Sequence, residues 1–258
     1  MIDVTELCAG YHGTEILHGI DLHLARGKIT AVIGPNGCGK TTLLRALSGL
    51  LPVGGGEILY AGKPRESYTR REFARLCAFL PQARDVPALT VEALVAHGRY
   101  PHLSFGRSLT KADREQIKAA MEQADVAELA ARNLTELSGG QRQRAYLAMT
   151  LAQDTDVLFL DEPTTYLDVG QKYEVMELLQ KIKALGKTVI LVLHDLPLAF
   201  SYSDEVAVLQ DGKLLAFGPS EEVFAGGAAG RAFGVTCQKA EVSGKSEYFF
   251  SYSSKKEK

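Results

Sequence analysis

Short apolar runs without polar alternation recur along the chain and mark its expected strands. They occur at Lys28–Gly34, Val157–Leu160 and Thr188–Leu193. Runs of this kind are typical of strands buried on both faces, as in parallel sheets. Helical spacing from Lys40 to Leu47 follows the first run, so we expect a strand, a turn and a helix there. The alternation predicts an α/β fold with a mainly parallel sheet.

Two further segments combine apolar stretches with turn residues. They span Gly56–Lys63 and Glu205–Gly218, and in the second the pair Asp211 and Gly212 is the expected turn. An Asp-Gly pair between apolar stretches is a strong hairpin signal, because both positions of the turn need a positive φ. We therefore expect a small antiparallel β region beside the parallel strands.

The pattern changes to a helical one from Leu89 to Gln153. We expect this stretch to form a helical subdomain, about residues 89–153, inserted into the α/β core. The main domain is predicted to span residues 1–234, followed by a short C-terminal tail, 235–258. The end of that tail, "SSKKEK", is biased in composition and is expected to fray.

Composition narrows the class of protein. The 258 residues are 46% hydrophobic and 23% charged, as in ordinary globular proteins, and the formal net charge of -2 gives no reason to expect nucleic-acid binding. No apolar run approaches the roughly 18 residues of a membrane span, and the first residues lack the pattern of a signal peptide. The cysteines, scattered without metal-ligand spacing, are Cys8, Cys38, Cys77 and Cys237. We expect a cytosolic protein with reduced thiols.

A candidate phosphate-binding loop lies between the first strand and its helix. The segment "GPNGCGKTT" matches the pattern G-x-x-x-x-G-K-[ST]. Glycines let successive N–H groups wrap a phosphate chain, Lys40 reaches the terminal phosphates, and the Thr41 hydroxyl can bind Mg²⁺. The alternative is a plain glycine-rich turn, and at Cys38 a small tolerated residue is favoured over a redox switch. The expected nucleotide-binding residues here are Gly34, Pro35, Asn36, Gly37, Cys38, Gly39, Lys40, Thr41 and Thr42.

Two carboxylates follow the second buried strand, in "VLFLDEP". Ligands of open α/β sheets bind beyond the carboxyl ends of the strands, so Asp161 and Glu162 should emerge beside the phosphates. Asp161 is the candidate metal residue, and Glu162 is placed to orient or deprotonate an attacking water. His194 ends the next strand and is a candidate γ-phosphate contact, although a lone histidine is more often structural.

The segment "LSGGQ" raises a different question. Ser138 and Gln141 fit a capping box at a helix start, but capping does not require Gly139 and Gly140, which weaken a helix. Bare N–H groups at a helix start can form an anion site, yet the chain already has one phosphate loop. A second such site needs a second phosphate or a second chain.

Together, "GPNGCGKTT", "LSGGQ", "VLFLDEP", the pair Leu167 and Asp168, and His194 resemble the nucleotide-binding subunit of an ATP-binding cassette (ABC) transporter. The resemblance spans roughly residues 2–225 and implies a P-loop NTPase core with bound ATP and Mg²⁺. In that family two cassettes meet head to tail, and each signature helix serves the ATP of the other. The further ATP-site residues that the resemblance implies are Tyr11, as the adenine-stacking aromatic, Gln82, which reaches Mg²⁺, and Ser138, Gly139, Gly140, Gln141 and Asp168.

A narrower resemblance lies in "HGRYPH", His97–His102, and "DEPTTYLD", Asp161–Asp168. These segments are similar to cassettes of importers for iron-siderophore complexes, haem and cobalamin. The chain departs from that branch at Gln171 and Lys172, where a His-Gln pair is frequent, and at Pro197, where asparagine is usual. The departures leave the expected ATP chemistry intact and loosen the assignment of cargo.

The expected function is therefore ATP hydrolysis that powers uptake of a metal chelate, with Glu162, His194, Lys40 and Gln82 as catalytic residues and Thr41, Gln82 and Asp161 at the metal. The implied partners are a second cassette, expected to be a second copy of this chain, transmembrane permease subunits and an extracytoplasmic binding protein, with the chain at the cytoplasmic face of the membrane. An ABC ATPase for another cargo, a cassette acting outside transport, and a small-molecule kinase are the alternatives. A kinase is disfavoured because Glu162 beside Asp161 suits attack by water.

Overall fold

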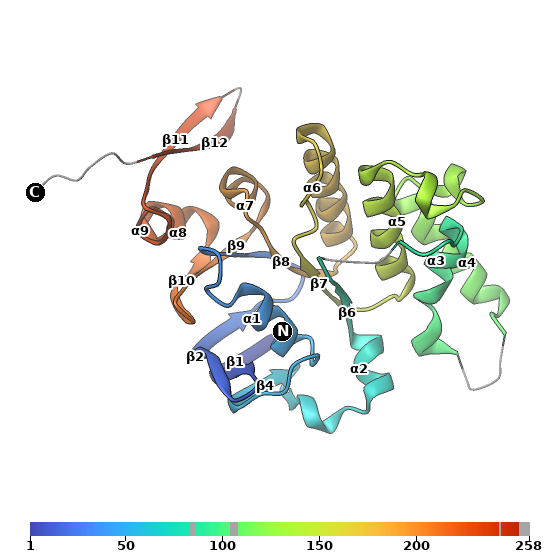
Figure 1. Cartoon of the computed structure of the whole chain (residues 1–258), viewed down its shortest axis with the longest axis horizontal. Coiled ribbons are helices and arrows are strands. Elements are labelled where there is room, and N and C mark those ends of the chain that lie inside the picture. Colours follow the sequence, from blue (N-terminus) through green and yellow to red (C-terminus); the bar gives the residue numbers. More distant parts are fainter. Residues whose placement is uncertain (83–85, 104–107, 243, 253–258) are drawn as a thin grey trace, which may run out of the picture. The chain divides into compact units, whose positions relative to one another are not determined.

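The computed structural model describes residues 1–82, 86–103, 108–242 and 244–252. The chain divides into two compact units (Figure 1). Unit 1 comprises Met1–Arg65 and Val189–Lys258, and unit 2 comprises Glu66–Thr188. The expected "SSKKEK" end lies outside the described residues.

Unit 1 contains an antiparallel sheet with the strand order β2-β1-β4-β5. The register of Tyr60 with Lys63 closes the β4–β5 hairpin around Ala61 and Gly62, which have φ angles of 49° and 77°. This is the predicted hairpin at Gly56–Lys63, although its second strand is short. The strands are β1 (Ile2–Tyr11), β2 (Thr14–Leu24), β4 (Gly55–Tyr60) and β5 (Lys63–Pro64).

The central strand of unit 1 is β3 (Ile29–Ile33), which pairs in parallel with β8 (Thr188–Val192) and β9 (Glu205–Gln210). Every residue of β3 and β8 is buried, as the unbroken apolar runs predict. Strand β10 (Lys213–Pro219) runs antiparallel to β9. Their turn is the predicted pair Asp211 and Gly212, with φ angles of 48° and 74°.

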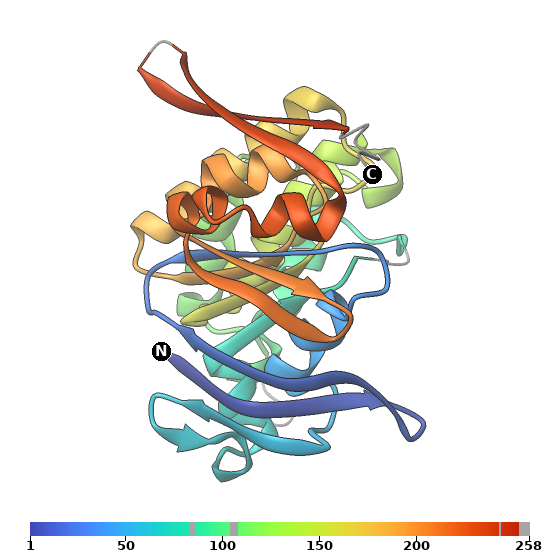
Figure 2. The same ribbon diagram turned by 90° about the vertical axis from the view of Figure 1, so that its left-hand side faces the viewer.

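The helices of unit 1 are α1 (Lys40–Leu47), α7 (Leu196–Tyr202), α8 (Ser220–Ala225) and α9 (Ala228–Phe233). After α9 the chain forms a hairpin of β11 (Val235–Val242) and β12 (Lys245–Tyr252), which Figure 2 shows above α8 and α9. The ring centroids of Phe224 and Tyr248 lie 4.8 Å apart, and Phe250 stacks on Phe200 at 5.9 Å. The aromatic contacts hold a segment for which the sequence analysis predicted neither strands nor helices.

Unit 2 contains one parallel strand pair, β6 (Cys77–Leu80) with β7 (Val157–Asp161), among its described residues. The stretch predicted to be helical contains α3, α4 and α5, and its patterned residues Ile117, Met121 and Ala124 are buried. That this stretch is an inserted subdomain stays a prediction. The helices are α2 (Arg70–Leu76), α3 (Val91–His97), α4 (Lys111–Gln123), α5 (Gly139–Ala152) and α6 (Val169–Ala184), with short 3-10 turns at Arg65–Ser67, Tyr100–His102, Ala127–Leu129 and Leu134–Glu136.

The architecture is mixed α/β, with parallel strands in both units and small antiparallel sheets, as predicted. In the part of the chain that the structure describes, no helix is both long enough and apolar enough to span a membrane.

Candidate functional site

The candidate phosphate loop joins β3 to α1 and is packed tightly inside unit 1. A Cβ atom on Gly34 would lie 2.2 Å from the carbonyl oxygen of Leu209, and one on Gly39 would lie 2.8 Å from Cδ2 of Leu17. Gly39 also has a φ of 104°, which side chains rarely tolerate. Contact with the backbone therefore excludes a side chain at Gly34, and the positive φ disfavours one at Gly39.

Lys40 begins α1 and is only 5% exposed. Its Nζ donates hydrogen bonds to the carbonyl oxygens of Gly34, at 2.8 Å, and Pro35, at 2.9 Å. These bonds hold the ammonium group against the loop, which suits a lysine whose role is to meet an anion there.

The first turn of α1 carries no acidic residue of its own. No side chain caps this helix. The partial positive charge of the helix N-terminus therefore adds to that of Lys40 and favours a bound anion. Thr41 is half-buried and Thr42 is buried in the same turn.

Cys38 lies inside the loop and is 4% exposed. Burial raises the pKa of its thiol, an effect larger than the opposing one of the Lys40 charge. The thiol is therefore protonated at neutral pH and packs as a small apolar group.

Two other predicted residues lie in unit 1 with the loop. Tyr11 ends β1, and its hydroxyl accepts a hydrogen bond from Arg45 of α1 at 3.4 Å, so its ring lies beside the helix that begins at the loop. His194 is exposed and follows β8. Because β3 and β8 are parallel neighbours, with Val32 opposite Val192, His194 and the loop leave the same edge of the sheet.

The catalytic candidates of unit 2 also follow neighbouring parallel strands. Leu80 of β6 pairs with Leu160 of β7, and Gln82 and Glu162 follow these ends. Nε2 of Gln82 donates to Oε2 of Glu162 at 2.5 Å, and Asp161 is 3% exposed. The structure thus brings Gln82, which the family resemblance implied, to Glu162, which was predicted from its place at a strand end.

A third group, which the sequence analysis missed, orients the same carboxylate. Oγ1 of Thr165 donates to Oε2 of Glu162 at 2.8 Å. Glu162 has a φ of 52°, an uncommon backbone conformation for this residue. The sequence did contain a signal for this contact, because a threonine closely follows the acidic pair in a tight turn. Short polar side chains frequently form hydrogen bonds to nearby groups in turns.

The predicted capping box at the start of α5 is confirmed. Oγ of Ser138 accepts from the Gln141 N–H at 3.3 Å, and Oε1 of Gln141 accepts from the Ser138 N–H at 3.1 Å. Ser138 and Gly139 are exposed, whereas Gly140 is buried.

The two glycines of this helix start differ in what surrounds them. A Cβ on Gly140 would lie 2.8 Å from Cδ of Gln171, so packing within the chain explains this glycine. A Cβ on Gly139 would meet Leu167 at 3.7 Å and the Tyr166 carbonyl at 3.8 Å, which are ordinary contacts. Only Gly139 lacks an internal steric reason.

Asp168 caps α6, because its Oδ1 accepts from the Gln171 N–H at 2.8 Å. Asp168 is exposed, and Tyr166 before it is 93% exposed with a φ of 64°. The cap accounts for Asp168 as a structural residue and does not by itself indicate a nucleotide contact.

The segment His97–His102 serves structure in unit 2. Arg99 pairs with Asp113 at 3.0 Å and donates to the carbonyl oxygen of Ala152 at 2.8 Å, with both charged residues buried. Hydrogen bonds from Thr110, and then from Arg99, lower the pKa of Asp113 to about 2. The pair therefore ties the end of α3 to α4 and to the last residue of α5.

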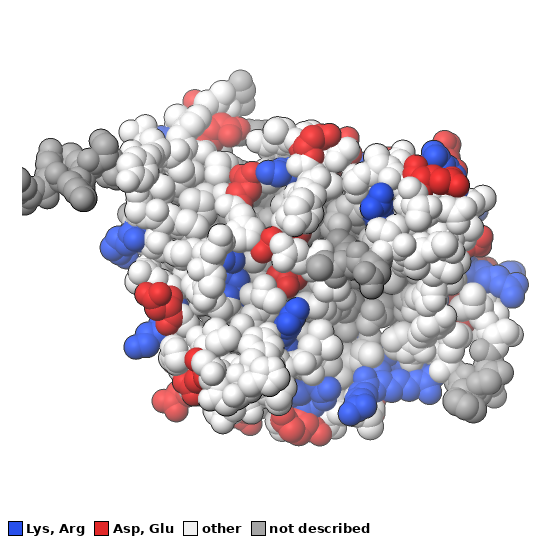
Figure 3. Space-filling model, viewed as in Figure 1, with Lys and Arg blue, Asp and Glu red and all other residues white. Residues whose placement is uncertain are grey.

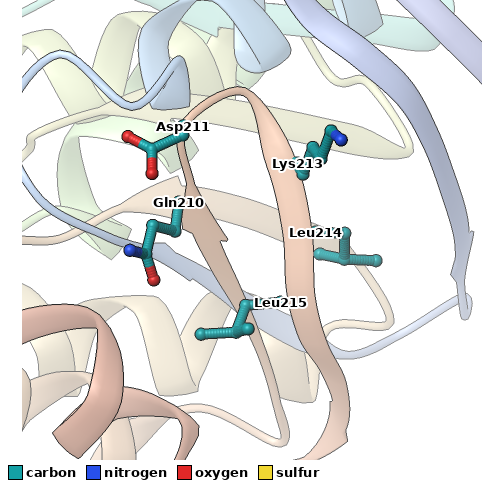
Figure 4. A pocket seen from close by; sticks show the side chains of 5 residues that line it. All are labelled: Gln210, Asp211, Lys213, Leu214 and Leu215. Carbon is teal, nitrogen blue, oxygen red and sulfur yellow. The ribbon is translucent and has the colours of Figure 1, made fainter.

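A shallow hollow lies along the β9–β10 hairpin, lined by Gln210, Asp211, Lys213, Leu214 and Leu215 (Figure 4). It contains none of the predicted site residues. On the face drawn in Figure 3, acidic and basic side chains are interspersed over most of the surface. Within the described residues, no group of three or more His, Cys, Asp or Glu side chains could hold a metal ion.

The family model described as ABC transporter matches residues 17–165, more than half of the chain. The chain belongs to the ABC transporter family. It is 41% identical to petrobactin import ATP-binding protein FpuD of Bacillus anthracis over 239 residues, covering 92% of this chain and 88% of that protein. It is 39% identical to ferric enterobactin transport ATP-binding protein FepC of Escherichia coli, covering 90% of this chain and 86% of that protein.

Solved structures agree with this membership. A chain of an ABC transporter in an inward-facing conformation superposes with a TM-score of 0.84 at 26% identity, covering 97% of each chain. The cbiO1 protein of Clostridium perfringens, part of the ABC transporter complex cbiONQ, has a TM-score of 0.78 at 31% identity, covering 89% of this chain and 92% of that one. The predicted family and P-loop NTPase fold are confirmed, and this ABC protein is an ATP-binding subunit and an ATPase.

Proposed function

We propose that this ABC ATPase powers the import of an iron chelate through a separate membrane permease. The observation that carries the proposal is the set of relatives at about 40% identity along most of the chain, which are named as ATP-binding proteins of petrobactin import, iron(3+)-hydroxamate import and ferric enterobactin transport. A relative named for achromobactin transport extends the same set. An extracytoplasmic binding protein would deliver the chelate to the permease, and the ATPase would act at the cytoplasmic face of the membrane.

ATP binding is assigned to the loop and the groups around it in unit 1. The N–H groups at the uncapped start of α1 and the ammonium of Lys40 bind the phosphates, and Tyr11 stacks on the base. His194 contacts the γ-phosphate from the same edge of the sheet. The support is the placement of these groups within one unit.

Within unit 2 the proposed Mg²⁺ donors are the side chains of Gln82 and Asp161, and within unit 1 the candidate donor is the Thr41 hydroxyl. A hydroxyl, an amide and a single carboxylate suit Mg²⁺, which usually keeps several waters and takes other ligands from phosphates. When bound, the ion would neutralise charge on the phosphates.

Hydrolysis is assigned to Glu162 as the residue that orients and deprotonates the attacking water. Gln82 and Thr165 both donate to its Oε2, so the carboxylate is held in place for its role as proton acceptor. Gln82 would thereby link the metal, the catalytic carboxylate and the membrane partner.

The functional assembly is proposed to be a head-to-tail dimer of two copies. Ser138 and Gly139 are exposed at the start of α5, and Gly139 lacks an internal steric requirement, so their surface is available to the ATP held by the partner. Gly140 and Gln141 support this surface through packing and capping, while Asp168 would reach the partner from the start of α6. ATP binding would close the dimer and hydrolysis would release it.

Cargo and chemistry are tested together by uptake of a radiolabelled ferric siderophore in the source cells after deletion of the gene. We expect uptake to fall to background and to return with the unaltered chain but not with Glu162→Gln, which keeps the shape of the side chain and loses its basicity. ATP turnover of the purified variant should fall on the order of 100-fold while ATP binding persists. Full uptake in the deleted strain, for every ferric chelate tried, would overturn the proposed cargo.

The shared site is tested by a forced dimer of one Lys40→Ala chain and one Gly139→Asp chain. If the sites are shared, one site carries both changes and the other carries neither, so one site should still occlude ATP. The Asp side chain acts through charge, because it faces the γ-phosphate of the partner. Loss of occlusion at both sites in a folded, associated dimer would contradict sharing, and a dimer carrying Gly139→Asp in both chains is the matched control.

A further inference from the structure

The turn between β9 and β10 is hydrogen-bonded to the candidate phosphate loop. The N–H of Gly212 donates to the carbonyl oxygen of Cys38 at 3.2 Å, and the carbonyl oxygen of Gly212 accepts from the N–H of His18 at 2.9 Å. Gly212 thus connects the loop to strand β2, because its N–H bonds to the loop and its carbonyl oxygen bonds to the strand. All of these residues belong to unit 1.

The approach at Gly212 is too close for any side chain. A Cβ there would lie 2.0 Å from the carbonyl oxygen of Ile16 and 2.6 Å from Cδ2 of His18. The first of these contacts is with backbone, so a change of rotamer cannot relieve it. Gly212 also has a φ of 74°.

The same hairpin supports the loop at a second point. The carbonyl oxygen of Leu209, at the end of β9, would lie 2.2 Å from a Cβ on Gly34. The loop therefore meets the hairpin at Gly34 and at Cys38, near both of its ends.

We propose that the Asp211–Gly212 turn (Figure 4) is a positioning element that aims the N–H groups of the phosphate loop at ATP. The peptide bond after Cys38 is planar and trans, so its carbonyl and the N–H of Gly39 point in opposite directions. By holding the Cys38 carbonyl, Gly212 directs the Gly39 N–H away from the hairpin and into the space that the loop encloses. The inference rests on the proposed assignment of this loop to the phosphates.

The β4–β5 turn provides a matched control. It has the same register, with Tyr60 opposite Lys63, and Gly62 has a φ of 77°, but a Cβ on Gly62 would meet nothing within 4 Å. Gly62→Ala therefore introduces the backbone strain alone, whereas Gly212→Ala introduces that strain and displaces the turn from β2.

The first experiment measures the ATP dissociation constant of the two variants. We expect Gly212→Ala to weaken ATP binding about tenfold, because the loop donors are no longer aligned, and Gly62→Ala to leave it unchanged. Site-resolved alkylation gives a readout independent of activity. The thiol of Cys38 should react faster in Gly212→Ala, while buried Cys77 of unit 2 serves as the internal reference. Equal ATP affinity and equal Cys38 reactivity in the two variants would overturn the proposal.

Hydrogen exchange in the unaltered chain tests the same coupling if Gly212→Ala does not fold. If the Asp211–Gly212 turn positions the loop for ATP, bound ATP must also stabilise that turn, because coupling between sites is reciprocal. We expect ATP to slow exchange of the Gly212 amide and to leave the Gly62 amide unaffected, and an unchanged Gly212 amide would overturn the inference. Lys40→Ala tests the assignment of the loop separately from the role of the turn. ATP binding that is unaffected by this change would overturn the loop assignment itself.

Discussion

The phosphate loop and the start of α5 are both glycine-rich helix starts, but they are built differently. At the loop, contact with the backbone excludes a side chain at Gly34, the positive φ disfavours one at Gly39, and α1 has no side-chain cap. At α5, Ser138 and Gln141 complete a capping box, and Gly139 is exposed with room for a methyl group. The first helix start has no side-chain cap, whereas the second is capped by its own residues.

This difference shows that the glycines of a motif fall into two classes, according to whether the chain itself leaves room for a side chain. A glycine that its own chain crowds is explained by the fold, as Gly140 is by Gln171. A glycine with open space on an exposed surface points to a contact outside the chain, and Gly139 is of this kind. The comparison therefore supports a loop that serves its own ATP and a helix start that serves the ATP of a partner.

The largest effect that tests the comparison is expected from Lys40→Ala. This change removes the buried ammonium group from the loop, and we expect ATP turnover to fall on the order of 100-fold or more. Phosphate release by the purified chain is the measurement. Turnover near that of the parent would remove the functional distinction between the two helix starts.

Asp113→Asn tests the buried ion pair with Arg99 that holds the end of α5, in a different unit from the phosphate loop. The variant leaves the guanidinium of Arg99 buried without its counter-charge, so the free energy of unfolding should fall by about 3 kcal/mol. Because the folded pKa of Asp113, about 2, lies below the ordinary 3.8, the carboxylate stabilises the fold above pH 3.8, and that contribution is lost as the pH falls through about 2.

Urea unfolding of parent and variant across this pH range is the measurement. The difference between the two proteins should shrink as the pH falls from 3.8 toward 2. A constant difference would show that Asp113 acts through its shape and not through its charge.

The pair Gly34→Ala and Gly139→Ala compares the two helix starts directly. Gly34→Ala should cost about 1–3 kcal/mol of unfolding free energy because a methyl group meets backbone. Gly139→Ala should leave stability unchanged or raise it by up to about 1 kcal/mol, since alanine is the better helix former. Thermal or urea unfolding of both variants gives the answer, and equal losses would contradict the sorting of glycines.

The smallest effects are expected at Tyr11. Tyr11→Leu should weaken ATP binding about fivefold through loss of stacking worth about 1 kcal/mol. Tyr11→Phe keeps the ring and loses only an exposed hydrogen bond of 3.4 Å from Arg45, so affinity should stay within about twofold of the parent. Titration with a fluorescent ATP analogue distinguishes the two, and equal losses in both variants would exclude stacking as the role of Tyr11.

Much of the site followed from local patterns. The strand, loop and helix around Lys40, the hairpin turn at Gly212 and the capping box at Ser138 were predicted because each depends on residues close in sequence. The contact of Gln82 with Glu162 was not predicted, because the two residues lie far apart in the chain and the family resemblance implied only that Gln82 reaches Mg²⁺. Thr165 and the β11–β12 hairpin were missed, the latter because its strands are held by contacts with Phe200 and Phe224.

The sequence by itself determined which elements form, where the candidate phosphate loop lies and which family the chain belongs to, because periodicity, turn chemistry and motif spacing act over short distances. Only the tertiary structure decided which glycines the chain itself requires. Gly34 meets Leu209, Gly212 meets Ile16 and Gly140 meets Gln171, and each of these contacts joins segments that folding brings together. Close packing is a property of those non-local contacts, since whether a methyl group fits depends on atoms that the local sequence does not contain.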